Sequence, residues 1–156
     1  MLIYFLLFLS MRKIKRLIIH CSATKEGQEY SVDTITKWHK KRGFRTIGYH
    51  FLVHLDGSIS KGRNISEMGA HCKGYNRDSI GVCYVGGLDR NGKPKDTRTK
   101  EQKETLRNLS KILKVMFDFN EVKGHRDYSR DLNGDGVISK NEWMKSCPCF
   151  DVKTEL

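Results

Sequence analysis

The sequence lacks an apolar stretch long enough to span a bilayer. Its first ten residues, MLIYFLLFLS, are apolar, but a transmembrane helix needs about 20 such residues. The stretch also lacks the basic n-region and the small-residue cleavage site of a secretory signal. Residues 1–12 could be a wrongly assigned start with Met11 as the true initiator, a short uncleaved anchor or an extra edge strand. We expect one domain over residues 13–156, and membrane association only if this extension is real.

Acidic residues are few relative to basic ones. The chain has 18 Asp and Glu against 29 Lys and Arg, for a net charge of +11. Such an excess favours polyanionic partners. The basic residues are dispersed, however, and neither an aromatic RNA-binding signature nor a DNA-reading helix is apparent. We therefore expect no specific nucleic-acid partner.

The five cysteines cannot all pair with one another. Cys21, Cys72 and Cys83 lie in or beside predicted core segments, where free cysteine commonly acts as a small buried hydrophobe. The odd count argues for synthesis in a reducing compartment, although a single disulfide stays possible.

Four segments predict the strands of a sheet in an α/β domain. They cover residues 14–19, 49–55, 79–85 and 122–124. The second alternates, which places Tyr49 and His50 on opposite faces, and it meets the hairpin signal Asp56-Gly57. The third is mostly apolar without alternation, so we expect it to be the central strand, covered on both faces.

Two helices are predicted from caps and periodicity. Ser31 can cap a helix over residues 32–42, on which His39 reads as a half-buried packing residue. Thr99 and Gln102 form a capping box for a second helix. Its core stripe is expected to be Leu106, Leu109, Leu113 and Met116.

Three residues far apart in the sequence have the chemistry of a metal site. A catalytic zinc ion needs three protein ligands and an open position. His20 ends the first strand, His125 follows the last one, and Cys147 or Cys149 would complete the set. Pro148 between the two cysteines would strain an arrangement with both sulfurs on one ion.

An ordered set of motifs resembles a known family. The motifs are IIHCSAT, WHKKRGF, IGYHFLVHLDG, HCKGYNRDSIGVCYVGG, GHRD and KSCPCFDV. They are similar to the zinc N-acetylmuramoyl-L-alanine amidases of the phage-lysozyme and peptidoglycan-recognition-protein type. The resemblance covers about residues 13–152. It implies a peptidoglycan-recognition-protein-like fold, a single domain with a central mixed β-sheet flanked by helices.

The resemblance also implies roles for individual residues. It assigns the zinc ligands to His20, His125 and Cys147, and further catalytic roles to Tyr49 and Lys145. It also places His71 and Asn76 along the substrate groove.

The implied reaction is hydrolysis of the amide bond between N-acetylmuramic acid and L-alanine in peptidoglycan. Such an enzyme would be a monomer, made in the bacterial cytoplasm and acting at the cell wall or periplasm, with the export route undetermined. Two other functions stay open. One is a non-catalytic peptidoglycan-binding module, which Cys147 argues against because such modules usually lose that ligand. The other is an inhibitor of a phage polymerase.

Residues 131–142 form an insertion that matches an EF-hand loop. The candidate calcium ligands are the side chains of Asp131, Asn133, Asp135, Ser139 and Glu142, with the backbone carbonyl of Val137. A turn with solvated carboxylates is the other reading. We expect calcium here, holding the insertion so that Lys145 and Cys147 face the zinc.

Overall fold

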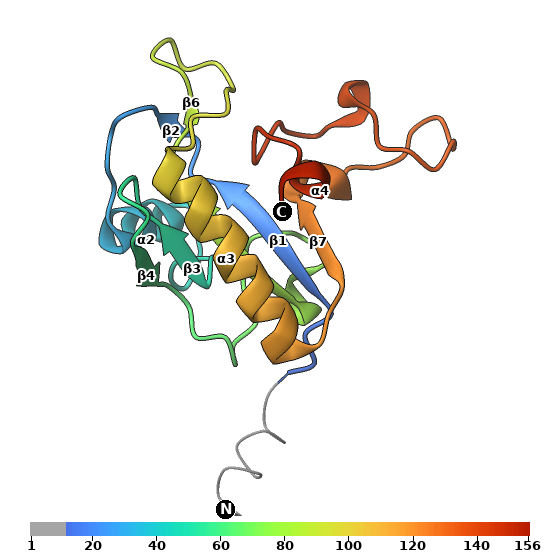
Figure 1. Ribbon diagram of the computed structural model, residues 1–156, viewed down its shortest axis with the longest axis horizontal. Coiled ribbons are helices and arrows are strands. Elements are labelled where there is room, and N and C mark those ends of the chain that lie inside the picture. The colour runs from blue at the N-terminus through green and yellow to red at the C-terminus, as the bar shows by residue number, and fades with distance from the viewer. Residues whose placement is uncertain (1–11) are drawn as a thin grey trace, which may run out of the picture.

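A five-stranded mixed sheet forms the centre of the domain (Figure 1). The computed structural model describes residues 12–156, so the expectations for residues 1–11 lie outside the described part. The strand order is β4-β3-β5-β1-β7, in which only the β3–β4 pair is antiparallel. The strands are β1 (Arg16–Cys21), β3 (Phe51–Val53), β4 (Ile59–Lys61), β5 (Ser79–Tyr84) and β7 (Glu121–Gly124). The α/β prediction and the central position of β5 are both confirmed.

The parallel register brings the ends of β1 and β7 together. Ile19 of β1 lies opposite Gly124 of β7. His20 and His125, one residue further along each strand, therefore meet at the same edge of the sheet. Side chains alternate along a strand, and Cys21 joins the hydrophobic core on the α3 side of the sheet.

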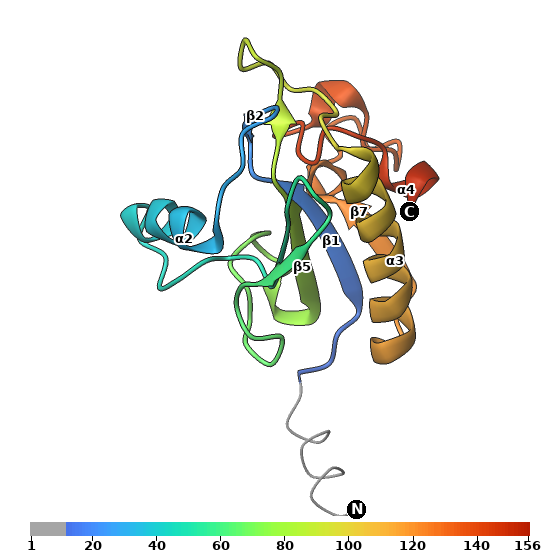
Figure 2. The same cartoon turned by 60° about the vertical axis from the view of Figure 1, so that its left-hand side comes forward.

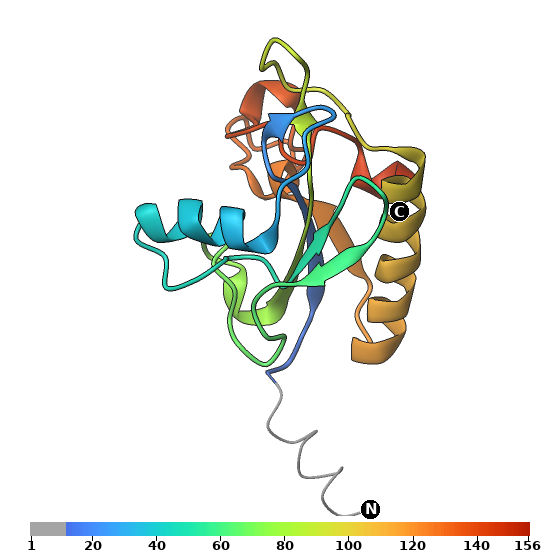
Figure 3. The ribbon, with the colours of Figure 1, turned by 90° about the vertical axis from the view of Figure 1, so that its left-hand side faces the viewer.

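The two long helices cover opposite faces of the sheet (Figures 2 and 3). Helix α2 (Val32–Lys41) packs Ile35 against Leu52 and Cys83. Helix α3 (Lys100–Phe117) packs three leucines onto the other face. The caps from Ser31 and from the Thr99–Gln102 capping box are formed as predicted. Shorter elements are β2 (Thr24–Lys25), β6 (Gly87–Leu88), α4 (Val152–Glu155) and the 3-10 turns Asn76–Asp78, His125–Tyr128 and Lys140–Glu142.

The predicted core stripe of α3 is wrong at its last position. Leu106, Leu109 and Leu113 are buried, but Met116 is 59% exposed. Phe117, four residues after Leu113, packs against the core instead. Positions three and four residues along a helix lie on the same face, and here the aromatic side chain takes the place. No helix within residues 12–156 is long and apolar enough to cross a membrane.

The folded domain includes Arg12, which the sequence assigned to the extension. Its Nε donates to the carbonyl of Ile65 at 2.8 Å, and its Nη1 donates to the carbonyls of Asn76 and Arg77 at 3.2 and 3.1 Å. These bonds tie Arg12 to two loops of the domain.

Candidate metal centre

His20, His125 and Cys147 form one compact cluster. Their ligand atoms all lie within 4.8 Å of one another, and no other such group of three His, Cys, Asp or Glu side chains occurs within residues 12–156. The two Nδ1 atoms are 3.1 Å apart, and Cys147 Sγ lies 3.8 Å from His20 Nδ1. Tetrahedral zinc with ordinary bond lengths would separate two nitrogens by about 3.3 Å and a nitrogen from a sulfur by about 3.6 Å. The geometry and chemistry of the donor set therefore fit zinc.

The loop that carries Cys147 is fixed to the end of the sheet. Arg126 N donates to the Cys147 carbonyl at 2.8 Å, and Cys21 N donates to Cys147 Sγ at 3.3 Å. Pro148 packs against Gly124, where an added Cβ would approach the proline Cδ to 2.5 Å. A residue other than glycine at position 124 would therefore displace this loop.

Cys149 points away from the cluster. Its Sγ donates to the carbonyl of Gly87 at 3.2 Å and lies 3.9 Å from Cys21 Sγ. All five cysteines are free thiols in the structure.

His71 lies beneath His20. Its Nδ1 is 2.9 Å from His20 Nε2, and its Nε2 is 3.3 Å from the hydroxyl of Ser79. The ring occupies a slot that Gly81 leaves open, since an added Cβ there would come within 2.6 Å of it. The sequence placed His71 along the substrate groove. The structure leaves it only 8% exposed, in contact with a candidate ligand.

Burial keeps the histidines of the cluster neutral. Burial removes water from the rings of His20 and His71 and lowers the pKa of each well below the usual value for histidine. Burial and the nearby charge of Lys145 lower the pKa of His125 to about 4. A metal-binding imidazole must be deprotonated, so at neutral pH these rings are in the form that a metal ion requires.

Tyr49 and Lys145 border the same cleft as the cluster. The cleft has a volume of about 220 Å³. The Tyr49 ring lies 5.1 Å from that of His20, and burial raises the pKa of its phenol well above the usual value. Tyr49 therefore stays a neutral hydrogen-bond donor. Lys145 is exposed, and no carboxylate of the described residues lies within 4.0 Å of its amine.

Helix α2 forms the opposite wall of this cleft through Trp38, His39 and Arg42. His39 is more than the packing residue that the sequence suggested. Its Nδ1 accepts from Gly48 N at 2.9 Å, and its ring lies 5.2 Å from that of Tyr49. It thus both lines the cleft and supports Tyr49. The only signal in the sequence was the helical face that it shares with Trp38 and Arg42.

Asn76 shapes the loop that leads away from the cleft. Its Oδ1 accepts from the backbone N–H groups of His71 and Cys72, both at 2.8 Å. It also borders a second hollow of about 420 Å³ that shares His71, His125 and Lys145 with the cleft. The cleft and this hollow are therefore neighbours that share part of their lining.

The EF-hand-like loop gives no support to the calcium expectation. Asp131 accepts from the backbone of Gly134 and Gly136, and Asp135 accepts from Val137. Backbone N–H groups, that of Ser139 foremost, lower the pKa of Glu142 to about 2. The carboxylates do not gather as a metal-binding group would. They stabilise the turns of the loop instead.

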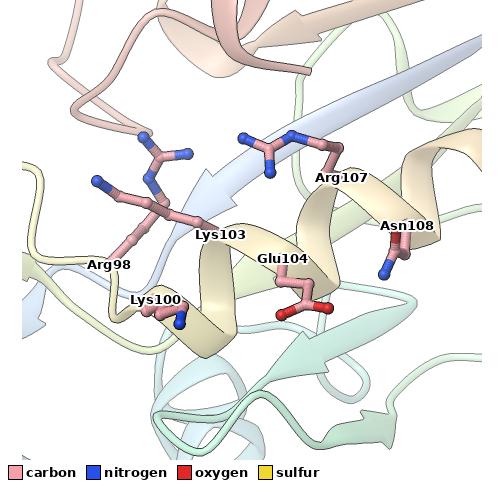
Figure 4. A pocket seen from close by; sticks show the side chains of 6 residues that line it. All are labelled: Arg98, Lys100, Lys103, Glu104, Arg107 and Asn108. Carbon is pink, nitrogen blue, oxygen red and sulfur yellow. The ribbon is translucent and has the colours of Figure 1, made fainter.

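A further hollow lies on α3 and differs in chemistry from the cleft. Figure 4 shows its lining, with Lys103 and Arg107 projecting from the helix beside Arg98. Arg98 is paired with Asp96 and Glu155. The lining contains neither histidine nor cysteine, so it offers no soft metal ligand.

Comparison with protein families matches residues 10–149 to "N-acetylmuramoyl-L-alanine amidase". An endolysin of Klebsiella phage KP32 is 36% identical over 146 residues, which cover 94% of this chain and 87% of the relative. An endolysin of Enterobacteria phage T3 is 38% identical over 137 residues, covering 88% and 82%.

Solved structures agree in fold. The N-acetylmuramoyl-L-alanine amidase LysC from Clostridium intestinale URNW superposes with a TM-score of 0.70 at 23% identity, covering 94% of this chain and 83% of that one. The bumblebee peptidoglycan-recognition protein SA gives a TM-score of 0.63 at 25% identity, with 84% of each chain covered.

Proposed function

Because the chain belongs to the N-acetylmuramoyl-L-alanine amidase family, we propose that His20, His125 and Cys147 bind the zinc ion with which it cleaves its substrate. The enzyme hydrolyses the amide bond between N-acetylmuramic acid and L-alanine in peptidoglycan, as an endolysin-like amidase. The observation that carries the zinc proposal is the convergence of two imidazole nitrogens and one sulfur within 4.8 Å.

Zinc would supply a Lewis acid that polarises the scissile carbonyl and lowers the pKa of the attacking water. The protein provides neutral imidazoles for it, because burial lowers the histidine pKa values. Cys147 adds a thiolate, so the bound site would keep a net positive charge.

Lys145 is proposed to stabilise the oxyanion of the tetrahedral intermediate. Its amine borders the cleft without a competing carboxylate among the described residues. Removing one such donor typically costs a factor of about 10²–10³ in kcat.

Tyr49 is proposed to orient the attacking water as a neutral hydrogen-bond donor. Its raised phenol pKa argues against a role as a general base at neutral pH. In this proposal Lys145 stabilises the oxyanion and Tyr49 orients the water, two roles that the sequence alone could not assign.

His71 is proposed to set the tautomer of His20. If His71 Nε2 donates to Ser79, its Nδ1 accepts from His20 Nε2 and leaves His20 Nδ1 free for the metal. Partners of this kind orient metal-bound histidines. Its role would then be indirect, through His20, and Asn76 would likewise act by holding the loop.

Calcium is not part of this proposal, because the carboxylates of the loop do not gather as a metal-binding group would. The substrate is peptidoglycan, and the enzyme acts on the cell wall. A monomeric state is proposed as the simplest assembly, since the three ligands come from one chain.

Digestion of purified peptidoglycan, followed by mass spectrometry, tests the proposal. Wild type should release stem peptides that begin at L-alanine and leave peptide-free glycans. Cys147→Ala should lose both this activity and one equivalent of bound zinc. The matched control, Cys149→Ala, should keep both, because its sulfur bonds to Gly87. If the wild-type protein sediments with the wall but releases no peptides, the chain is a peptidoglycan-binding module and not an amidase.

A further inference from the structure

A separate cavity lies on the outer side of the loop that carries Cys147. It has a volume of about 460 Å³ and is lined by Pro94, Arg126, Lys140, Trp143, Ser146 and Cys149. None of these residues lines the cleft of the metal cluster. The cavity is therefore not an extension of the active site.

Arg126 brings a nearly buried positive charge to this cavity. Its side chain is 12% exposed. Its guanidinium makes no hydrogen bond to any residue within 12–156, and its Nε is buried without an acceptor. The nearest carboxylate oxygen, Asp127 Oδ1, is 4.0 Å away, and the other oxygen of Asp127 already accepts from Gly124 N. The guanidinium carries five N–H donors, and only its Nε is closed off from solvent, so its Nη groups remain accessible without an acceptor among the described residues.

Trp143 lines the cavity beside Arg126. The Arg126 guanidinium lies 4.0 Å from the centre of its ring, a cation–π distance. The indole Nε1 is buried and has no partner among the described residues. The buried nitrogens Arg126 Nε and Trp143 Nε1 are closed to a ligand in the cavity, so the open donors of Arg126 are its Nη groups.

The remaining charge on the lining is also positive. Lys140 is exposed at the rim, with no carboxylate of the described residues within 4.0 Å. The Ser146 hydroxyl offers a further donor. No acidic side chain lines the cavity. A ligand with several acceptor atoms and a negative charge complements this set of donors.

We propose that this cavity binds an oxyanion, a carboxylate or a phosphate, carried by an anionic polymer of the cell wall. The Nη groups of Arg126 and the hydroxyl of Ser146 donate to it, and Lys140 adds attraction from the rim. The site holds the polymer outside the cleft, so binding here does not require cleavage or bound zinc.

Trp143 makes the proposal directly measurable by fluorescence. The chain has two tryptophans, so Trp38→Phe leaves Trp143 as the only indole. Sodium phosphate and sodium acetate are titrated separately against sodium chloride of equal ionic strength. A saturable change in emission with phosphate or acetate, absent with chloride, is expected. The tighter of the two identifies which oxyanion the site prefers.

Variants in the Trp38→Phe background assign the response to the cavity. Arg126→Met should weaken binding about tenfold or more, because a charged donor is lost. Lys140→Met should weaken it by a smaller factor, since that amine is solvated. Arg130→Met, at an exposed arginine outside the lining, should change nothing. Circular dichroism shows that each variant is folded.

Two results would overturn the proposal. One is a response to both oxyanions that matches chloride. The other is saturable binding that persists unchanged in both folded Arg126→Met and folded Lys140→Met. Repeating the titration with Cys147→Ala separates this site from the amidase proposal, because the cavity should still bind when the metal site has been removed.

Discussion

His71→Ala should weaken zinc binding by 10- to 100-fold while leaving all three proposed ligands in place. The substitution removes the only protein acceptor within hydrogen-bond distance of His20 Nε2 among the described residues, a contact of 2.9 Å. His20 itself is 1% exposed, so water cannot readily replace the lost partner. The ring of His20 would then be free to change its tautomer and orientation.

The size of the loss in zinc affinity depends on whether the substitution destabilises the zinc-bound or the zinc-free protein. With zinc on Nδ1, the proton must be on Nε2, where it becomes a buried donor without an acceptor. That costs about 1–3 kcal/mol. Without zinc, the proton can move to Nδ1, 3.1 Å from His125 Nδ1. The cost therefore falls mainly on the bound state, in line with the about 10–100-fold loss expected for outer partners of a metal site.

Competition with a chromogenic zinc chelator measures the dissociation constant. His71→Asn should recover much of the affinity, because the amide oxygen can occupy the position of Nδ1 as an acceptor. His54→Ala is the matched control, since His54 bonds to Glu29 and Ser60 rather than to the cluster. Zinc affinity within threefold of wild type for folded His71→Ala would refute the proposal that His71 sets the tautomer of His20. An affinity of His71→Asn no higher than that of His71→Ala would refute it as well.

Three further predictions concern catalysis, acid stability and the inserted loop. Lys145→Met should lower kcat by a factor of about 10²–10³ with zinc content unchanged. If the variant lost bound zinc in the same proportion as activity, the amine would instead support the metal site. Five of the six histidines are buried, and their pKa values lie below that of an unfolded histidine. The unfolded chain therefore binds more protons, and stability should fall as pH drops from about 6.5 towards 4, by at most about 1.4 kcal/mol per pH unit for each histidine. Urea unfolding of metal-free protein measures this, and His39→Gln should reduce the slope; a flat profile would contradict the burial argument. Calcium should leave the melting temperature and the activity unchanged, whereas a rise abolished by Glu142→Gln would restore the calcium expectation.

Elements set by local chemistry were predictable from the sequence. Ser31 and the Thr99–Gln102 pair satisfy the first N–H groups of their helices, a requirement that neighbouring residues alone can meet. The meeting of His20 with His125 was predictable for a different reason. His20 lies near the end of β1 and His125 directly follows β7, and parallel strands bring their carboxyl ends to one edge of a sheet.

The burial of individual side chains, and contacts between segments far apart in the sequence, were not predictable in this way. His71 sits in a loop motif that looks solvated, and its burial requires that Gly81, on another element, lack a side chain. Arg126 and Trp143 are 17 residues apart and meet only because the loop after residue 129 folds back. Hydrophobic periodicity carries no information about such contacts.

The loop over residues 131–142 shows why a complete motif was still insufficient. Aspartate and asparagine at alternate positions serve as calcium ligands, but the same short side chains here also accept from backbone N–H groups two to five residues ahead. Glu142 is equally suited to both roles, as a terminal ligand or as the partner of Ser139 in a capping box. The two uses involve the same oxygen atoms, and the sequence spacing is identical in both. What separates them is whether the oxygens converge on one point, and the acidic side chains of this loop do not gather as a metal-binding group would. The backbone hydrogen bonds alone do not decide between the two uses, because a carboxylate oxygen has two lone pairs and can accept from an N–H while it binds an ion.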